Sequence, residues 1–228
     1  MSDIKYRISI SRININIHFI YNSRLEKKNL FILYIINQMN INSNRLMNSK
    51  YKDKIAYFIN NTDLNAYFPN CKIVKFAELD NYASIYELLP NKLDFAFILV
   101  EEEKNTGHWQ LLLRNQGEFS FFDSYGDKPT TILNFIPKYM NRLLGNDYDR
   151  DMGHILKSVK KGDKLIINKF PFQSNLDGVN TCGRWCIART NLFMANGVDN
   201  AQFVKYIKRE QKNTKLTLDE LVCALITI

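Results

Sequence analysis

Three short segments of the sequence carry the side-chain types of a nucleophilic active centre. Thr181-Cys182-Gly183-Arg184-Trp185-Cys186 follows Gly107-His108-Trp109 and Phe121-Phe122-Asp123-Ser124-Tyr125-Gly126. A cysteine at the start of a helix favours the thiolate, a histidine moves the proton, and a carboxylate orients the histidine. The chain order His, Asp, Cys therefore predicts Cys182 as nucleophile, His108 as general base and Asp123 as the orienting acid.

Each of these residues also has a simpler interpretation. A lone cysteine is most often a buried structural thiol, and Asp123 can cap the turn that it enters. Asp127 and Asp177 are alternatives for the orienting acid. A histidine on a strand is often only a hydrogen-bonded part of the core.

A zinc site is a further alternative for the cysteines. Cys182 and Cys186 together with His108 or His154 offer metal-binding atoms, but their spacing is poor for zinc. We therefore expect no metal, and expect Cys186 to be a core residue or a neighbour of the site.

Several residues near these motifs are candidates for binding substrate. Gln173 precedes Cys182 by nine positions, so its amide can donate to an oxyanion together with the backbone N–H of Cys182. We expect Trp109 and Gly183 to contact substrate, although Trp109 is equally suited to core packing. Arg184 and Trp185 are expected to stabilise the helix and its packing.

The composition predicts a soluble globular protein. The 228 residues include 46% hydrophobic and 24% charged residues, which suits one domain with an appendage. The longest apolar run, 30–36, is too short for a bilayer, which needs about 20 residues. The Met-Ser-Asp start lacks the features of a secretory signal, and four cysteines do not form a disulfide framework in a chain of this length.

The net charge of +8 favours polyanionic partners. Lys157, Lys160 and Lys161 are candidates for weak, salt-sensitive binding to nucleic-acid backbones, with a solvated surface as the alternative. No known base-reading motif is present.

The periodicity predicts an α+β fold with helices packed on a mixed sheet. Residues 4–20 alternate like a β-ribbon, 25–40 is an apolar helix, and 40–48 is an Asn-rich linker, which gives an extension over 1–48 and a main domain over 49–228. In the main domain the pattern predicts strands over 95–100, 108–114, 118–123 and 164–170, and helices over 50–60, 84–89, 131–144, 181–195, 200–211 and from 217.

The three motifs together resemble those of the adenain-like processing cysteine proteases, and most of all the versions in virophages, polinton-like elements and giant DNA viruses. The wider clan includes the SUMO-specific proteases. The resemblance spans residues 73–228. It implies a papain-like, circularly rearranged core, with Cys182, His108, Asp123 and Gln173 in the roles given above. The spacing from Gln173 to Cys182 is longer than is usual in adenovirus and SUMO proteases.

The resemblance also implies a biological setting. Such relatives cut capsid precursors during virion maturation, so we expect capsid precursor proteins as substrates, DNA as a stimulating scaffold and no required cofactor. We expect the protein in the virion interior and at viral assembly sites in the host cytoplasm, without a membrane partner. The alternatives are an isopeptidase for ubiquitin-like modifiers, an acyltransferase of the same clan, and a basic nucleic-acid-binding virion protein.

Overall fold

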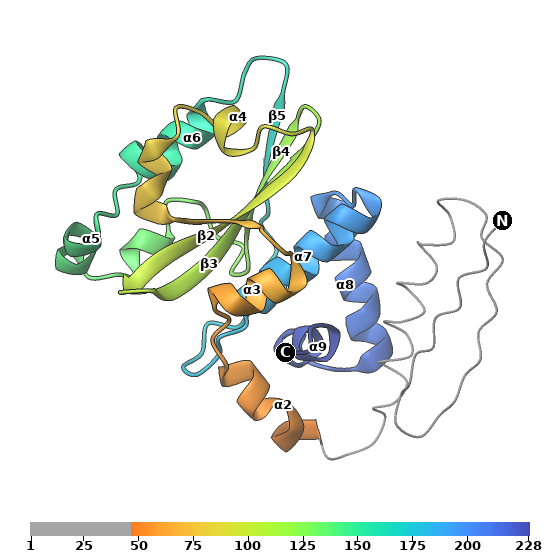
Figure 1. The fold of residues 1–228 in the computed structure, drawn as a ribbon. Coiled ribbons are helices and arrows are strands. Elements are labelled where there is room, and N and C mark those ends of the chain that lie inside the picture. The colour runs from red at the N-terminus through yellow and green to blue at the C-terminus, as the bar shows by residue number, and fades with distance from the viewer. Residues whose placement is uncertain (1–46) are drawn as a thin grey trace, which may run out of the picture.

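The computed structural model describes residues 47–228, in which helices pack on both faces of a mixed sheet (Figure 1). The expected ribbon over 4–20, the helix over 25–40 and His18 lie outside these residues. The described elements are α2 (Met47–Ala56), α3 (Asn61–Tyr67), β1 (Lys72–Lys75), η1 (Phe76–Asn81), α4 (Ile85–Leu88), β2 (Leu93–Glu103), β3 (Thr106–Asn115), β4 (Glu118–Asp123), η2 (Ile132–Asn134), α5 (Lys138–Leu144), η3 (Asp149–Gly153), α6 (His154–Lys157), β5 (Lys164–Ile167), α7 (Cys182–Asn196), α8 (Asn200–Thr214) and α9 (Leu218–Leu225).

The five strands form one sheet in the order β1-β2-β3-β4-β5. The three central strands are antiparallel neighbours, whereas the edge strands β1 and β5 pair in parallel with β2 and β4. This is the α+β, mixed-sheet class that the periodicity predicts. Residues of β3 and β4 face each other in a register that sets Gln110 opposite Asp123.

Two hydrophobic clusters lie on the two faces of this sheet. Trp109 and Leu111 of β3 join the cluster that includes α7, α8 and α9, and Leu112 joins the one that includes α4 and α6. β2 is covered on both faces, and its central residues 95–100 are all apolar. Figure 1 shows α7–α9 on one side of the sheet and α4–α6 on the other.

The strand and late-helix predictions are confirmed with small boundary shifts. β4 has the predicted bounds, and α7 ends at Asn196 before Gly197, which has a left-handed φ of 62°. The last helix begins with a capping box at the predicted position, since Thr217 accepts from the N–H of Glu220. Pro137 delays the helix predicted over 131–144, so that α5 begins only at Lys138.

Other early-chain predictions need correction. The helix expected over 50–60 begins at Met47 and ends at Ala56. A separate helix, α3, follows at Asn61 with Asn60 as its N-cap. The four-residue β1 is not predicted at all, because it is too short to show a period of two.

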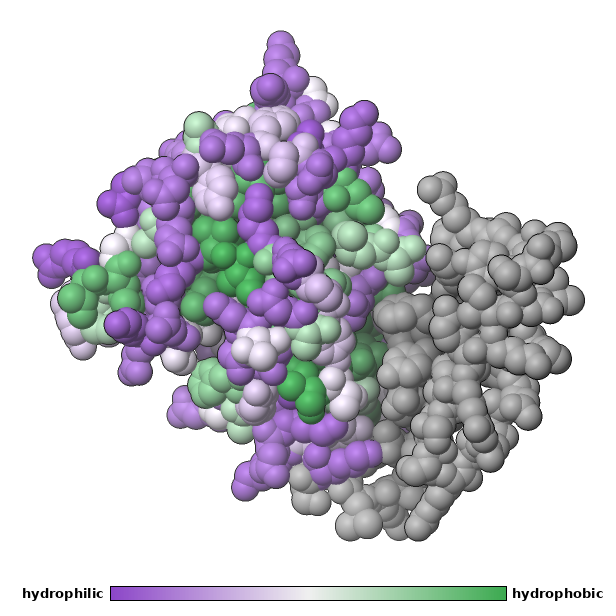
Figure 2. All heavy atoms as spheres, in the orientation of Figure 1, coloured by the Kyte–Doolittle hydropathy of each residue, from purple (hydrophilic) through white to green (hydrophobic). Residues whose placement is uncertain are grey.

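The side of the molecule seen in Figure 2 is mostly hydrophilic, with apolar residues between the charged ones. No helix within residues 47–228 is both long and apolar enough to cross a bilayer.

Candidate active site

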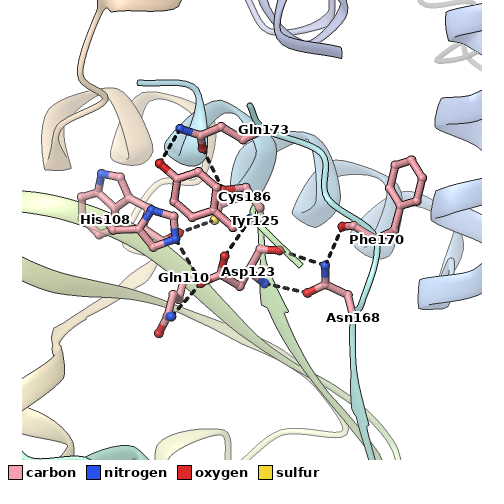
Figure 3. A network of polar contacts seen from close by, with 10 residues as sticks. His108, Gln110, Asp123, Tyr125, Asn168, Phe170, Gln173 and Cys186 are labelled. Atoms are coloured by element: carbon pink, nitrogen blue, oxygen red, sulfur yellow. Dashed lines mark hydrogen bonds and ion pairs between the residues drawn. The ribbon is translucent and has the colours of Figure 1, made fainter. Parts of the chain in front are cut away.

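The structure brings His108 and Asp123 into direct contact. His108 lies near the start of β3 and Asp123 at the end of β4, and His108 Nε2 is 3.0 Å from Asp123 Oδ2. Both side chains are almost fully buried. Figure 3 shows the two residues facing each other, with Gln110 beside them.

The buried pair changes the protonation of both groups. Burial acts against the charged form of His108, but the Asp123 carboxylate and a hydrogen bond with Cys182 outweigh it and raise the pKa of His108 well above its usual value. Burial also opposes ionisation of Asp123, yet His108 and hydrogen bonds from Gln110 and the Tyr125 N–H lower its pKa. The site therefore favours an imidazolium beside a carboxylate.

Cys182 contributes a thiol to the same cluster. It is the first residue of α7, is only 7% exposed, and lies close enough to His108 to help raise the pKa of that imidazole. The free N–H groups and dipole of the 15-residue α7 favour negative charge at this end. Cys182, His108 and Asp123 thus meet in the order that nucleophilic catalysis needs.

A second buried carboxylate holds the chain just before Cys182. Asp219 of α9 accepts from Thr181 Oγ1 at 2.6 Å and from Ser174 Oγ at 2.5 Å. Ser174 N also donates to Asp219, at 3.2 Å. These bonds fix the segment that enters α7.

Tyr125 and Gln173 close the cluster on another side. The Tyr125 ring stacks on His108, with centroids 4.9 Å apart and planes 14° apart. Gln173 accepts from Ser124 Oγ at 2.8 Å, and its Nε2 donates to Val179 O at 2.9 Å and Tyr125 Oη at 3.2 Å. Gln173 therefore lies at the site with its amide N–H groups on neighbouring oxygens (Figure 3).

The two expected substrate contacts are buried by the segment between α2 and α3. Trp109 is 3% exposed and donates from Nε1 to Ile59 O at 2.8 Å. A Cβ on Gly183 would lie 2.5 Å from Ile59 Cβ, so this glycine permits close packing. Asn180, in the loop before α7, donates to Ile55 O and Ala56 O at the end of α2.

Arg184 and Trp185 have the packing roles that the sequence predicts. The buried Arg184 guanidinium donates to Ile226 O and Lys54 O, and Trp185 lies in the core against Phe172. Cys186 is fully buried and donates from Sγ to Trp109 O at 3.5 Å, and burial raises the pKa of its thiol well above normal.

Comparison with known proteins places the chain in a viral family. No protein-family model matches it. It is 34% identical over 181 residues to uncharacterized protein V9 of Sputnik virophage, a match that covers 78% of this chain and 98% of V9. The chain belongs to the V9 family. A virophage connection is thus shown, while the name of V9 assigns no activity.

Other candidate groups of this V9-family protein lie apart or lack suitable partners. Asp177 is exposed. Burial and the Asp123 carboxylate raise the pKa of Asp127. Among the described residues, the carboxylate that bonds His108 is that of Asp123, at 3.0 Å. No group of three or more metal-binding side chains occurs in residues 47–228. All four cysteines, which fall within that range, are free thiols.

The three candidate lysines lie at the end of α6 and in the turn to β5. All are exposed, Lys157 pairs with Asp149 at 3.2 Å, and the Lys160 ammonium lies 4.7 Å from the centre of the Tyr86 ring. α6 lies on the face of the sheet opposite α7, so the sheet lies between these lysines and the helix that begins with Cys182 (Figure 1).

Three residues of the site have no role in the sequence-based prediction. Gln110 alternates with His108 along β3, a signal that places it on the same face but gives no function. Asn168 clamps the Asp123 backbone, accepting from its N–H at 2.7 Å and donating to its O at 2.8 Å. The sequence predicts Asp219 only as part of a helix start, and no local signal links it to Thr181.

Proposed function

We propose that this V9-family protein is a cysteine endopeptidase. The observation that carries the proposal is the buried contact of His108 with Asp123 at 3.0 Å and with Cys182 at the start of α7. The arrangement of a nucleophile helix packed on the antiparallel centre of a mixed sheet supports a papain-like core with rearranged chain order. Residues 182, 108 and 123 then act as nucleophile, base and orienting acid.

Peptide hydrolysis by this site proceeds in two stages. The Cys182 thiolate attacks the scissile carbonyl carbon, and the protonated His108 gives its proton to the leaving amine. Water then loses a proton to His108 and attacks the thioester, which releases the acid product and the Cys182 thiolate and so restores the thiolate–imidazolium pair. Since Nε2 of His108 is bonded to Asp123, Nδ1 is the nitrogen left for these transfers.

Gln173 is the proposed side-chain donor to the oxyanion. Its position is held by Ser124, and one of its N–H groups bonds the Tyr125 hydroxyl at the longer distance of 3.2 Å. When this N–H group turns from Tyr125 toward substrate, it and the backbone N–H of Cys182 supply two donors for the negative charge that develops on the carbonyl oxygen.

Capsid precursor proteins are the proposed substrates, and viral assembly sites are the proposed location. The 34% identity to a Sputnik virophage protein supports the viral setting, and the motif resemblance supports processing of virion proteins. The net charge of +8 supports DNA as a scaffold that brings enzyme and substrate together.

The decisive test uses purified wild type and Cys182→Ala with the unprocessed capsid proteins of the same virus. We expect discrete new N-termini, detected by peptide mass analysis, with wild type alone. Cys223→Ala is the matched control, because Cys223 is a buried thiol of α9 outside the site. Cleavage by Cys182→Ala would overturn the proposal, and release of a modifier with capsid protein left intact would favour the isopeptidase.

The DNA proposal has its own test. Replacing Lys157, Lys160 and Lys161 by Gln should weaken DNA binding and flatten its salt dependence, measured by fluorescence anisotropy. Replacing Lys205, Lys212 and Lys215 of the α8 region by Gln changes the same charge elsewhere. Equal effects of both triples would show that this lysine set is not a specific binding site.

A further inference from the structure

Gln110 is a buried polar residue whose contacts converge on the proposed acid. Its side chain is fully buried, and Nε2 donates to Asp123 Oδ2 at 2.8 Å. The same oxygen is 3.0 Å from His108 Nε2. The register of β3 and β4 sets Gln110 directly opposite Asp123, and strand alternation sets it beside His108.

The other end of the Gln110 amide is unsatisfied. Its Oε1 is buried and has no hydrogen-bond partner among residues 47–228. A buried acceptor without a partner destabilises the fold, and exchanging the amide ends would set an oxygen against the Asp123 carboxylate. An apolar side chain would avoid the unpaired acceptor, so stability alone does not account for glutamine at this position.

The carboxylate of Asp123 is held on both oxygens. Oδ1 accepts from Tyr125 N at 2.8 Å, and Oδ2 accepts from both Gln110 and His108. Without Gln110, Oδ2 would have only the imidazole as partner, and its full negative charge would act on that ring. The amide N–H of Gln110 both limits rotation of the carboxylate and draws off part of its charge.

We infer that Gln110 is a positioning residue, which aims Asp123 Oδ2 at His108 Nε2 and moderates the hold of Asp123 on the imidazolium, whose transferable proton is on Nδ1. The inference rests on the proposed function, because it assigns Gln110 to the same Cys182 centre. A moderated hold lets His108 release its proton to a leaving amine while the ring stays oriented.

The test compares Gln110→Leu and Gln110→Glu by two methods that need no substrate. These are NMR titration of His108 and the pH dependence of Cys182 alkylation by iodoacetamide. Gln110→Leu should raise the pH at which His108 loses its proton by about one pH unit, because the carboxylate keeps its full charge. Gln110→Glu should raise it further once the added carboxyl ionises.

Thermal unfolding and peptide cleavage complete the test. Gln110→Leu should keep or raise Tm, while its kcat for peptide cleavage should fall about tenfold. Ser120→Ala is the control, since Ser120 is a buried polar residue of β4 on the opposite face. Unchanged His108 and Cys182 titrations in both variants would overturn the inference. Shifted titrations in the Gln110 variants would support the inference even where the wild-type protein has no peptidase activity. The absence of that activity would contradict the proposed function.

Discussion

Two buried aspartates lie close to the start of α7, and they differ in what they bind. Asp123 accepts from His108, whose protonation can change, and from Gln110, whose other end is unpaired. Asp219 accepts only from the Thr181 and Ser174 hydroxyls and the Ser174 N–H among the described residues. One carboxylate therefore faces a titrating partner and the other a set of fixed dipoles.

This difference gives the two aspartates different proposed roles, since Asp123 would take part in catalysis and Asp219 would hold the chain in place. The Asp219 contacts tie α9 to the loop before Cys182 and have no group that can exchange a proton near neutral pH. The Asp123 contacts include an unsatisfied acceptor, which a purely structural cluster would not need. Gln173 and Ser174 link the two, because Gln173 bonds Ser124 on one side and Ser174 bonds Asp219 on the other.

The largest effect should come from Asp123→Asn. The new amide would face His108 Nε2 and Gln110 Nε2 with a donor group, so the imidazole loses its orientation and tautomer. We expect kcat for peptide cleavage to fall by about 10⁴ with little change in far-UV circular dichroism.

The matched change is Asp219→Asn. Hydroxyls can rotate to accept as well as donate, so the Ser174 and Thr181 partners can adapt to an amide. Activity should stay within about tenfold of wild type. Equal losses in both variants would remove the distinction between the two aspartates.

Gln173→Ala should have the next largest effect. It removes the proposed oxyanion donor, and we expect kcat to fall by about 10²–10³ while KM changes little. Steady-state cleavage of a fluorogenic peptide measures both constants. A loss confined to KM would assign Gln173 to substrate binding instead.

Asp219→Ala should mainly affect stability. It leaves the buried Thr181 hydroxyl and two partly buried donors of Ser174 without their acceptor, and we expect the free energy of unfolding to fall by about 3 kcal/mol in urea titrations. Asp199→Ala is a comparison, because it removes a partly exposed N-cap at α8 and should cost about 1 kcal/mol. A smaller loss for Asp219→Ala than for Asp199→Ala would show that the tie contributes little.

The smallest effect concerns the pH dependence of stability, which should depend on His108 and not on Asp219. The raised pKa of His108 means that its stabilisation is full below about pH 6.5 and is lost as the pH rises through the folded-state pKa. A pKa that is higher by one in the folded state than in the unfolded state adds about 1.4 kcal/mol to the free energy of unfolding. Urea unfolding between about pH 6 and 10 should show this decline in wild type and in Asp219→Asn, but not in His108→Gln.

The sequence predicts the residues of the proposed triad better than the residues that hold them in place. Cys182, His108 and Asp123 belong to compact motifs, and His108 and Asp123 come together because β3 and β4 form one hairpin. Asn168 and Asp219 are 45 and 38 residues from the groups that they bind, so no local pattern reveals them. Their contacts depend on how β5 and α9 return to the sheet.

Short elements explain most of the remaining differences in the fold. β1 has four residues and pairs in parallel with β2 across a long connection, which leaves no periodic trace. The start of α3 does have a local signal, since Asn60 and Asp63 form a capping box. The role of Gln110 has no local signal, because strand alternation predicts the face on which a residue lies but not the hydrogen-bond partner of each amide atom.

The contact between Gly183 and Ile59 has a consequence for how the family can diverge. Adding even one carbon at 183 would overlap the base of the Ile59 side chain, whose Cβ is 2.5 Å from the added atom. The two positions cannot drift independently. In homologues where position 183 gains a side chain, position 59 should become glycine or the α2–α3 segment should lie farther from α7, because any other residue at 59 keeps the Cβ that overlaps.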